Sequence, residues 1–298
     1  MAKEITAKTI LNKTKQRDPW LLDDYTVNPY SACSYNCLYC YIRGSKYGEH
    51  MQRAVSVKIN AAELLDKQLT LRARKEQYGF IVFSSVTDPY LHLESEYRLT
   101  RQLLEVVLRH RFPVHIITKS DMVVRDFDLI HEIDKRAILP KDLNCTNPRG
   151  ALVTFSFSTL DDTIARIFEP GAVSPNSRLK ALSASVDSGL HSGVSLMPLL
   201  PYISDTGESL ENFYSTFTEY GAQYILPASL SLYGSGRSDS KTLVLKAVEK
   251  HYPHLLNKYQ KFFTYSSQMP AYYRKAFDLK MNELHEKYAI SRQIFPAR

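Results

Sequence analysis

Short, continuous apolar runs alternate with amphipathic stretches along most of this chain. A run such as Phe80-Ile-Val-Phe83 has no polar positions between its apolar ones, which is typical of a strand buried on both faces of its sheet. Runs of this kind recur further along, and residues 24–29 could form a short strand before the first cysteines. The pattern predicts six strands, at residues 24–29, 80–83, 114–118, 152–157, 194–200 and 225–232.

In the stretches between these runs, apolar residues recur at helical spacing. Asn60 followed by Glu63 resembles a capping box, and Ser174 before Pro175 provides an N-cap and a first helical residue. Gly189 is the expected C-cap of the helix that Pro175 begins. The predicted helices cover residues 60–71, 94–110, 126–135, 174–186 and 206–220.

Strands that alternate with helices predict right-handed parallel crossovers. Six parallel strands are too few for a closed eight-stranded barrel. We therefore predict an α/β fold in which residues 25–234 form a partial (β/α)6 barrel of TIM type. Residues 1–24 are expected to be an N-terminal extension, and residues 235–298 a mainly helical region that packs on the barrel.

The composition is ordinary for a globular protein, with 44% apolar and 23% charged residues among 298. No apolar run is long enough to span a membrane, and the first residues lack the apolar core of a signal peptide. Cysteine is scarce and clustered, which favours the reducing cytoplasm over a disulfide framework. The net charge of +7 favours a polyanionic partner such as nucleic acid.

Three of the four cysteines lie close together, at Cys33, Cys37 and Cys40. Thiolates on one short loop can each ligate one iron of a cubane cluster, which leaves the fourth iron without a protein ligand. An open iron implies an exogenous ligand and chemistry at the cluster. Because Cys145 is the only other cysteine, a second cluster with four cysteine ligands is impossible. The alternative is a zinc site with His50 as the fourth ligand.

Polar side chains appear where the apolar runs stop. In barrels of parallel strands, chemistry gathers at the carboxyl ends of the strands. We therefore expect the segments at these ends to form one face together with the cysteine loop (residues 33–40). The segments are residues 84–90, 118–120, 156–159, 197–198 and 229–231.

The spacing of the cysteines, with Tyr39 before the third, resembles the signature of radical S-adenosylmethionine (SAM) enzymes. Further matches between about residues 28 and 230 narrow the resemblance to the branch that includes spore photoproduct lyase. They are Asn28-Pro29-Tyr30, Val57-Lys58-Ile59-Asn60, Thr87-Asp88-Pro89-Tyr90, Ile117-Thr118-Lys119-Ser120, Arg125-Asp126, Phe157-Ser158-Thr159-Leu160-Asp161 and Glu169-Pro170.

The resemblance implies a [4Fe–4S] cluster on Cys33, Cys37 and Cys40, SAM on its open iron, and a low-potential electron donor of the flavodoxin or ferredoxin type. Reductive cleavage of SAM would give a 5′-deoxyadenosyl radical, which abstracts hydrogen from a substrate at the barrel mouth. The branch and the positive charge indicate DNA or RNA as substrate, with repair or base modification as the reaction. The rivals are radical modification of a peptide or small metabolite, and a non-catalytic zinc- or cluster-bearing nucleic-acid-binding module.

Residue by residue, the resemblance also implies contacts with SAM. Tyr39 would pack beside the adenine, or else support the cysteine loop. Lys119 would face the methionine carboxylate, unless it is a solvated strand end. Ser156 or Ser158 would reach the ribose or the methionyl end. Asp88 would accept from the methionine ammonium, or only cap the turn that follows it.

Two departures from the branch bear on the reaction. Many radical SAM enzymes bind the methionine ammonium with Gly-Gly-Glu, and this chain has residues 84–88 in its place. The lyase carries a hydrogen-donating cysteine near this point, whereas this chain has Ser85 and Val86. The resemblance therefore does not extend to the lyase's own reaction, and no catalytic residue is assigned. Cys145 is expected to be a bystander.

Two weaker features remain. Glu169, in a turn-like segment, is a candidate to hold an arginine or a substrate. Near the C-terminus, basic and aromatic residues are interleaved, which can serve single-stranded nucleic acid; we favour an amphipathic helix that packs its rings inward. These residues are Lys258, Tyr259, Lys261, Phe262, Phe263, Tyr272, Tyr273, Arg274, Lys275 and Lys280.

Overall fold

The computed structural model describes residues 2–45, 48, 54–143 and 145–296. Its main sheet has the strand order β10-β9-β8-β7-β6-β3-β2. The edge strand β2 (Leu11–Lys13) is antiparallel to β3, and the other six strands are parallel, as the sequence predicts. They are β3 (Tyr25–Val27), β6 (Ile81–Phe83), β7 (Val114–Thr118), β8 (Ala151–Phe157), β9 (His191–Leu199) and β10 (Ile225–Ser229).

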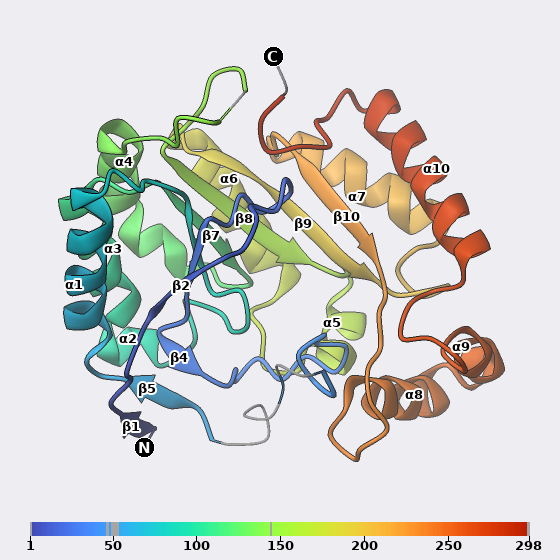
Figure 1. The fold of residues 1–298 in the computed structure, drawn as a ribbon. Helices are drawn as coiled ribbons and strands as arrows, with labels where there is room; N and C mark the ends of the chain where they lie inside the picture. Colours follow the sequence, from blue (N-terminus) through green and yellow to red (C-terminus); the bar gives the residue numbers. More distant parts are fainter. Residues whose placement is uncertain (1, 46–47, 49–53, 144, 297–298) are drawn as a thin grey trace.

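Helices connect the parallel strands and cover one side of the sheet. Figure 1 shows α6 and α7 behind the sheet, with α1, α3 and α4 at its left. The arrangement is an α/β partial barrel that is open between β10 and the β2 edge, which confirms the predicted fold class. The connecting helices are α1 (Ala61–Arg74), α3 (Leu99–His110), α4 (Phe127–Arg136), α6 (Pro175–Asp187) and α7 (Gly207–Glu219).

Most side chains of the six parallel strands are apolar and buried. Residues of β6, β7 and β8 form the main core with the inner faces of the helices. A second apolar cluster contains Phe80, Leu152 and Tyr224, which lie at the amino ends of three strands. Cys145 belongs to this second cluster. It therefore lies at the end of the sheet opposite to the expected reactive face.

The first residues are built into the barrel. Besides β2, they contribute β1 (Lys3–Ile5) to a small sheet with β5 (Ser56–Lys58) and β4 (Tyr30–Ser31). The sequence did not predict these strands, because two or three residues are too few to show periodicity. Residues 2–24 thus pair with strands of both sheets.

Three of the predicted helices differ from the prediction in detail. The Asn60 side chain caps nothing, because it pairs with the backbone N–H and C=O of Ala7, at 2.9 Å each. The helix predicted at 94–110 breaks at Arg98, whose φ of 46° is left-handed, into α2 (Glu94–Tyr97) and α3. The helix predicted at 126–135 is preceded by a 3-10 turn, η1 (Met122–Asp126). The Ser174 cap is confirmed, with the Ser177 N–H donating to its hydroxyl at 3.2 Å.

The C-terminal region is mainly helical, as predicted. It comprises α8 (Ser240–His251), η2 (Pro253–Leu255), α9 (Leu256–Phe262) and α10 (Ala271–Lys287). In Figure 1, α10 runs along the open side of the barrel beside β10, and it contacts both β10 and α7. One short helix, α5 (Asp162–Phe168), was not predicted. None of the helices in the described ranges is long and apolar enough to cross a membrane.

Candidate functional site

The cysteine loop lies at the carboxyl edge of the sheet, where contacts with later segments fix its shape. The Leu38 N–H donates to the Phe168 carbonyl at 2.9 Å, and the Gly171 N–H donates to the Tyr35 carbonyl at 3.0 Å. Gly171 admits this close approach because a Cβ there would lie 2.4 Å from the Ser34 carbonyl oxygen. Arg43, which sequence reasoning missed, is buried and donates from Nε to the Cys37 carbonyl at 3.1 Å.

The three thiols are poorly exposed, and burial raises the pKa of each. For Cys33 the pKa rises to about 12 through burial and, secondarily, the negative charge of Asp88. Burial and then Glu169 raise the pKa of Cys37. The Lys119 ammonium acts in the opposite direction on all three thiols, Cys40 included. Iron ligation requires thiolates, so binding at this loop would release protons.

The donor set fits a cluster better than a single ion. Across the described ranges, no three His, Cys, Asp or Glu side chains are placed to hold one metal ion. Sulfur atoms on one zinc lie within about 4 Å of each other, whereas the thiolates of a cubane each bind a different iron. Cys33, Cys37 and Cys40 lie on one short loop, so three such thiolates can each reach a different iron of one cluster. His50, the fourth ligand of the zinc alternative, lies outside the described residues.

The carboxylate of Glu169 joins three of the side chains that the sequence singled out. The Tyr39 hydroxyl donates to its Oε1. The Ser158 hydroxyl donates to the same oxygen at 2.7 Å. Lys119 Nζ lies 3.2 Å from this oxygen and 5.8 Å from the centroid of the Tyr39 ring. The cysteine loop and the ends of β7 and β8 thus meet at one buried anion.

A buried arginine, Arg178, completes this group. Its Nη2 pairs with Glu169 Oε2, its Nη1 donates to the Ser156 carbonyl at 2.9 Å, and its Nε donates to the Val173 carbonyl at 2.8 Å. Burial alone would raise the pKa of Glu169, but Lys119 and Arg178 outweigh burial and hold this pKa at about 2. The expectation that Glu169 holds an arginine is confirmed.

Sequence reasoning missed Arg178, although a signal existed. Arg178 and Leu182 are four residues apart, so they share one face of α6, and Leu182 is buried. A basic residue on a helix face that also carries buried leucines needs an anion inside the protein. Glu169, nine residues earlier in the chain, is that anion.

Asp88 and Ser156 take different positions. Asp88 Oδ1 accepts from the Thr118 hydroxyl and from the Tyr90 N–H, at 2.8 Å each, and Oδ2 accepts from the Lys119 N–H at 2.7 Å. Asp88 therefore joins the ends of β6 and β7, which matches the turn-capping alternative. Ser156 is half-buried at the end of β8 and does not contact Glu169 in the described part of the chain.

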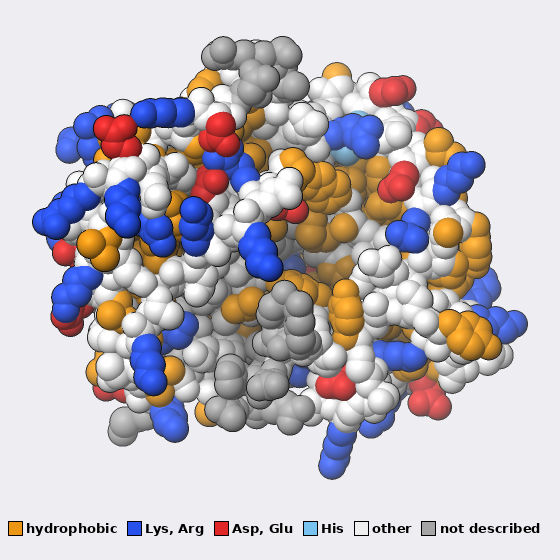
Figure 2. All heavy atoms as spheres, in the orientation of Figure 1, with side chains coloured by type: hydrophobic (Ala, Val, Ile, Leu, Met, Phe, Trp, Pro, Cys, Tyr) orange, Lys and Arg blue, Asp and Glu red, His pale blue; other side chains and the backbone are white. Residues whose placement is uncertain are grey.

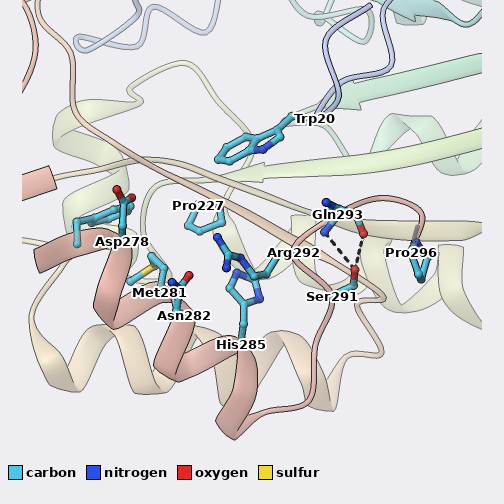
Figure 3. A pocket seen from close by; sticks show the side chains of 11 residues that line it. Trp20, Pro227, Asp278, Met281, Asn282, His285, Ser291, Arg292, Gln293 and Pro296 are labelled. Atoms are coloured by element: carbon cyan, nitrogen blue, oxygen red, sulfur yellow. Dashed lines mark hydrogen bonds between the residues drawn. The ribbon is translucent and has the colours of Figure 1, made fainter. Parts of the chain in front are cut away.

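A cavity of about 570 Å³ lies elsewhere, against the open side of the barrel. Figure 3 shows it between Trp20, Pro227 of β10 and side chains of α10 such as Asn282 and His285. The three cysteines and Glu169 are not among its lining residues. This cavity is therefore separate from the group of residues around the cysteine loop.

Comparison with known proteins finds uncharacterized relatives. An uncharacterized protein of Mycobacterium tuberculosis H37Rv, Rv2578c, is 27% identical over 99% of this chain and 83% of its own length. Protein MJ0683 of Methanocaldococcus jannaschii, also uncharacterized, is 28% identical over 71% of this chain and 74% of its own length.

Among solved structures, two forms of spore photoproduct lyase share the fold. A cysteine-to-serine mutant of the lyase has a TM-score of 0.64 at 14% identity, and the match covers 96% of this chain and 78% of the lyase. The complex with dinucleoside spore photoproduct has a TM-score of 0.62 at 15% identity, with the same coverage. Residues 27–215 match the radical SAM superfamily, and the chain belongs to that superfamily.

Proposed function

We propose that this protein is an enzyme that forms a 5′-deoxyadenosyl radical and applies it to a nucleic acid. The observation that carries the proposal is the convergence of Tyr39, Lys119 and Ser158 on Glu169, beside the loop with three cysteines. A [4Fe–4S] cluster and SAM, when bound, supply the one-electron cleavage of the C5′–S bond. Cys33, Cys37 and Cys40 would hold the cluster.

The side chains around Glu169 would bind and orient SAM. Lys119 carries the positive charge that would pair with the methionine carboxylate. Glu169 and the Tyr39 ring fix the position of the Lys119 ammonium. Ser158 is committed to Glu169, which leaves the Ser156 hydroxyl as the donor for the ribose. Asp88 holds the Lys119 backbone and so acts as a positioning residue for that lysine.

The substrate class is supported by charge and by likeness of fold. The chain carries a net charge of +7, which suits a polyanion. One solved lyase structure contains a dinucleoside spore photoproduct. Because this chain has Ser85 and Val86 near the lyase's hydrogen-donating cysteine, we propose a different net reaction on DNA or RNA. A flavodoxin- or ferredoxin-type donor in the cytoplasm would supply the electron.

Anaerobic reconstitution with iron and sulfide, followed by dithionite and SAM, tests the radical step. We expect the wild-type chain to bind iron and to release 5′-deoxyadenosine, and Cys37→Ala to lose both, because two thiolates cannot hold a cubane with one open iron. Cys145→Ala is the matched control, since Cys145 lies at the other end of the sheet, and it should retain both.

Two results would overturn the proposal. One is 5′-deoxyadenosine formation by Cys37→Ala at the wild-type rate. The other is one zinc and no iron per chain after anaerobic purification, which would favour the non-catalytic zinc module. If the radical step holds and no nucleic acid is modified, a peptide or a small metabolite becomes the substrate to test.

A further inference from the structure

Nearly all of the net positive charge resides in one segment. Residues 240–275 contain seven Lys and Arg residues against a single Glu, a balance of +6 in a chain whose total is +7. None of the salt bridges between described residues involves one of these cations; Lys241 instead donates to the Phe263 carbonyl. In Figure 2, basic and hydrophobic side chains lie side by side at the lower right, where Figure 1 places α9.

Part of this segment packs against an exposed aromatic platform, which Tyr202 and Phe262 form. Tyr202 is 45% exposed and stacks on Phe262 with the ring centroids 6.1 Å apart and the planes 11° from parallel. The Lys258 ammonium lies 4.3 Å from the centroid of the Tyr202 ring. Tyr273 packs edge-on against both rings. Nearby in sequence, Tyr272 is 69% exposed.

The platform is held in place at a conformational cost. Tyr202 has a φ of 59°, a left-handed conformation that a bulky side chain rarely adopts and that costs about 1 kcal/mol or more. Asp205 holds it there: Oδ1 accepts from the Tyr202 N–H at 2.5 Å, and Oδ2 accepts from the Tyr273 hydroxyl. A ring that stays 45% exposed gains only part of the energy that full burial would give. Strain of this kind is typical of binding surfaces.

The platform lies at the edge of the sheet that carries the site. Tyr202 follows β9, which ends at Leu199, so it lies beyond the carboxyl end of a barrel strand. The Tyr259 hydroxyl donates to the Pro201 carbonyl at 2.8 Å, which ties α9 to this edge. The start of α8 is tied to the segment directly after the cysteine loop, because the Ser240 hydroxyl donates to the Arg43 carbonyl at 3.2 Å.

We propose that Tyr202 and exposed cations of α9 and α10 form a docking face for single-stranded nucleic acid beside the barrel mouth. We call this set the mouth-side face: Tyr202, Lys258, Lys261, Tyr272, Arg274 and Lys275. An unpaired base stacks on Tyr202, and the lysines and arginine contact phosphates. This proposal rests on the proposed function, because it says where the nucleic acid that the enzyme would modify is bound. Buried Tyr259, Phe262 and Phe263 form the support, so the inward packing predicted from sequence holds for those three rings.

Fluorescence anisotropy of the full chain with a labelled oligothymidylate of about 12 nucleotides tests the face. Tyr202→Ala should weaken binding about tenfold through loss of stacking, and Tyr202→Phe should change it less than twofold because the ring remains. Lys258→Gln with Lys261→Gln should lower the slope of log K against log salt by about 1.4, since each lost single-strand phosphate contact removes about 0.7. The same oligonucleotide in a duplex should bind more weakly.

The matched control removes the same charge at the far side of the molecule. Arg74 and Lys75, both exposed, lie at the end of α1. Arg74→Gln with Lys75→Gln should leave the salt slope unchanged. The proposal is overturned if Tyr202→Ala binds like the wild type, or if both double variants lose the same affinity, which would mean attraction by net charge alone.

A second readout separates this proposal from failure of the enzyme. Dithionite-driven formation of 5′-deoxyadenosine without nucleic acid should be the same in the wild type and in the face variants. Its loss in every protein, the wild type included, would refute the proposed function and leave the binding result standing. The double variant Lys258→Gln with Lys261→Gln could instead bind the oligonucleotide normally and lower only the flavodoxin-driven formation of 5′-deoxyadenosine. The face would then bind an acidic electron donor, and our proposal would be wrong.

Discussion

Two buried glutamates in this molecule have similar surroundings and different positions. Glu169 and Glu94 are both inaccessible to solvent, and each accepts a hydrogen bond from a tyrosine hydroxyl, Tyr39 for Glu169 and Tyr30 for Glu94. Each also pairs with an arginine. Both tyrosines belong to segments through which the sequence resembles the radical SAM superfamily. Resemblance alone therefore does not tell a site from a scaffold.

The other contacts of the two carboxylates separate them. Glu94 accepts from the Thr100 N–H at 3.0 Å and pairs with Arg125 at 2.8 Å, and Arg125 also pairs with Asp126 at 2.7 Å. It therefore caps α3 and ties α2 and η1 together. Glu169 instead receives side chains from the cysteine loop and from two strand ends, Lys119 among them. A carboxylate whose partners come from the cysteine loop and the strand ends can position a ligand there, whereas one bound to backbone amides serves the fold.

The largest expected effect separates the two by substitution. Glu169→Gln should lower the free energy of unfolding by about 3–5 kcal/mol, because it leaves the buried Arg178 without its carboxylate partner. Glu94→Gln should lower it less, by about 1–3 kcal/mol, because Arg125 keeps its pair with Asp126. Only Glu169→Gln should also slow 5′-deoxyadenosine formation per folded chain, by roughly tenfold or more, because Lys119 and Tyr39 lose their orientation. Denaturant unfolding and anaerobic turnover measure the two effects. Equal turnover losses in both variants would contradict the distinction.

The free energy of unfolding should depend on pH through the Glu169 carboxylate. Since the pKa of Glu169 in the folded protein is about 2, below its usual 4.5, its stabilising contribution is complete above pH 4.5 and is lost as pH falls toward 2. The difference corresponds to roughly 3 kcal/mol. The gap in unfolding free energy between wild type and Glu169→Gln should narrow over that range. A gap that stays constant from pH 6 to pH 3 would show that Glu169 is not held ionised by Lys119 and Arg178.

The sequence was sufficient where periodicity and end residues carry the information. All six parallel strands were predicted, the later ones from apolar runs and the first as a short strand before the cysteines. The Ser174 cap was correct because its partner is only three residues away. Asn60 has the same local appearance, but its amide binds Ala7, which is distant in sequence. The helix break at Arg98 was missed because it depends on Glu94 folding back onto α3. Local signals fail where a distant partner competes for the side chain.

In the candidate site, too, local signals were found from the sequence and distant partners were missed. The three cysteines were evident from spacing, and Tyr39, Lys119 and Ser158 from the resemblance. Glu169, their common partner, was expected to hold an arginine or a substrate. Its contacts with Tyr39, Lys119 and Ser158 were not predicted. That arginine, Arg178, comes from a helix that begins after the cysteine loop and β8, so no local pattern connects it to either. Convergence on one anion is a property of the fold.

The smallest expected effect removes one hydroxyl from each glutamate. Tyr39→Phe and Tyr30→Phe should each lower the free energy of unfolding by about 1–2 kcal/mol, because each deletes one hydrogen bond to a buried carboxylate and keeps the ring. Tyr39→Phe leaves Ser158 and Lys119 on Glu169, so SAM affinity should fall only a few-fold with little change in the maximal rate. Tyr30→Phe should change neither. The rate of 5′-deoxyadenosine formation against SAM concentration measures both, and a shift in Tyr30→Phe as large as in Tyr39→Phe would mean that the two glutamates act as one unit.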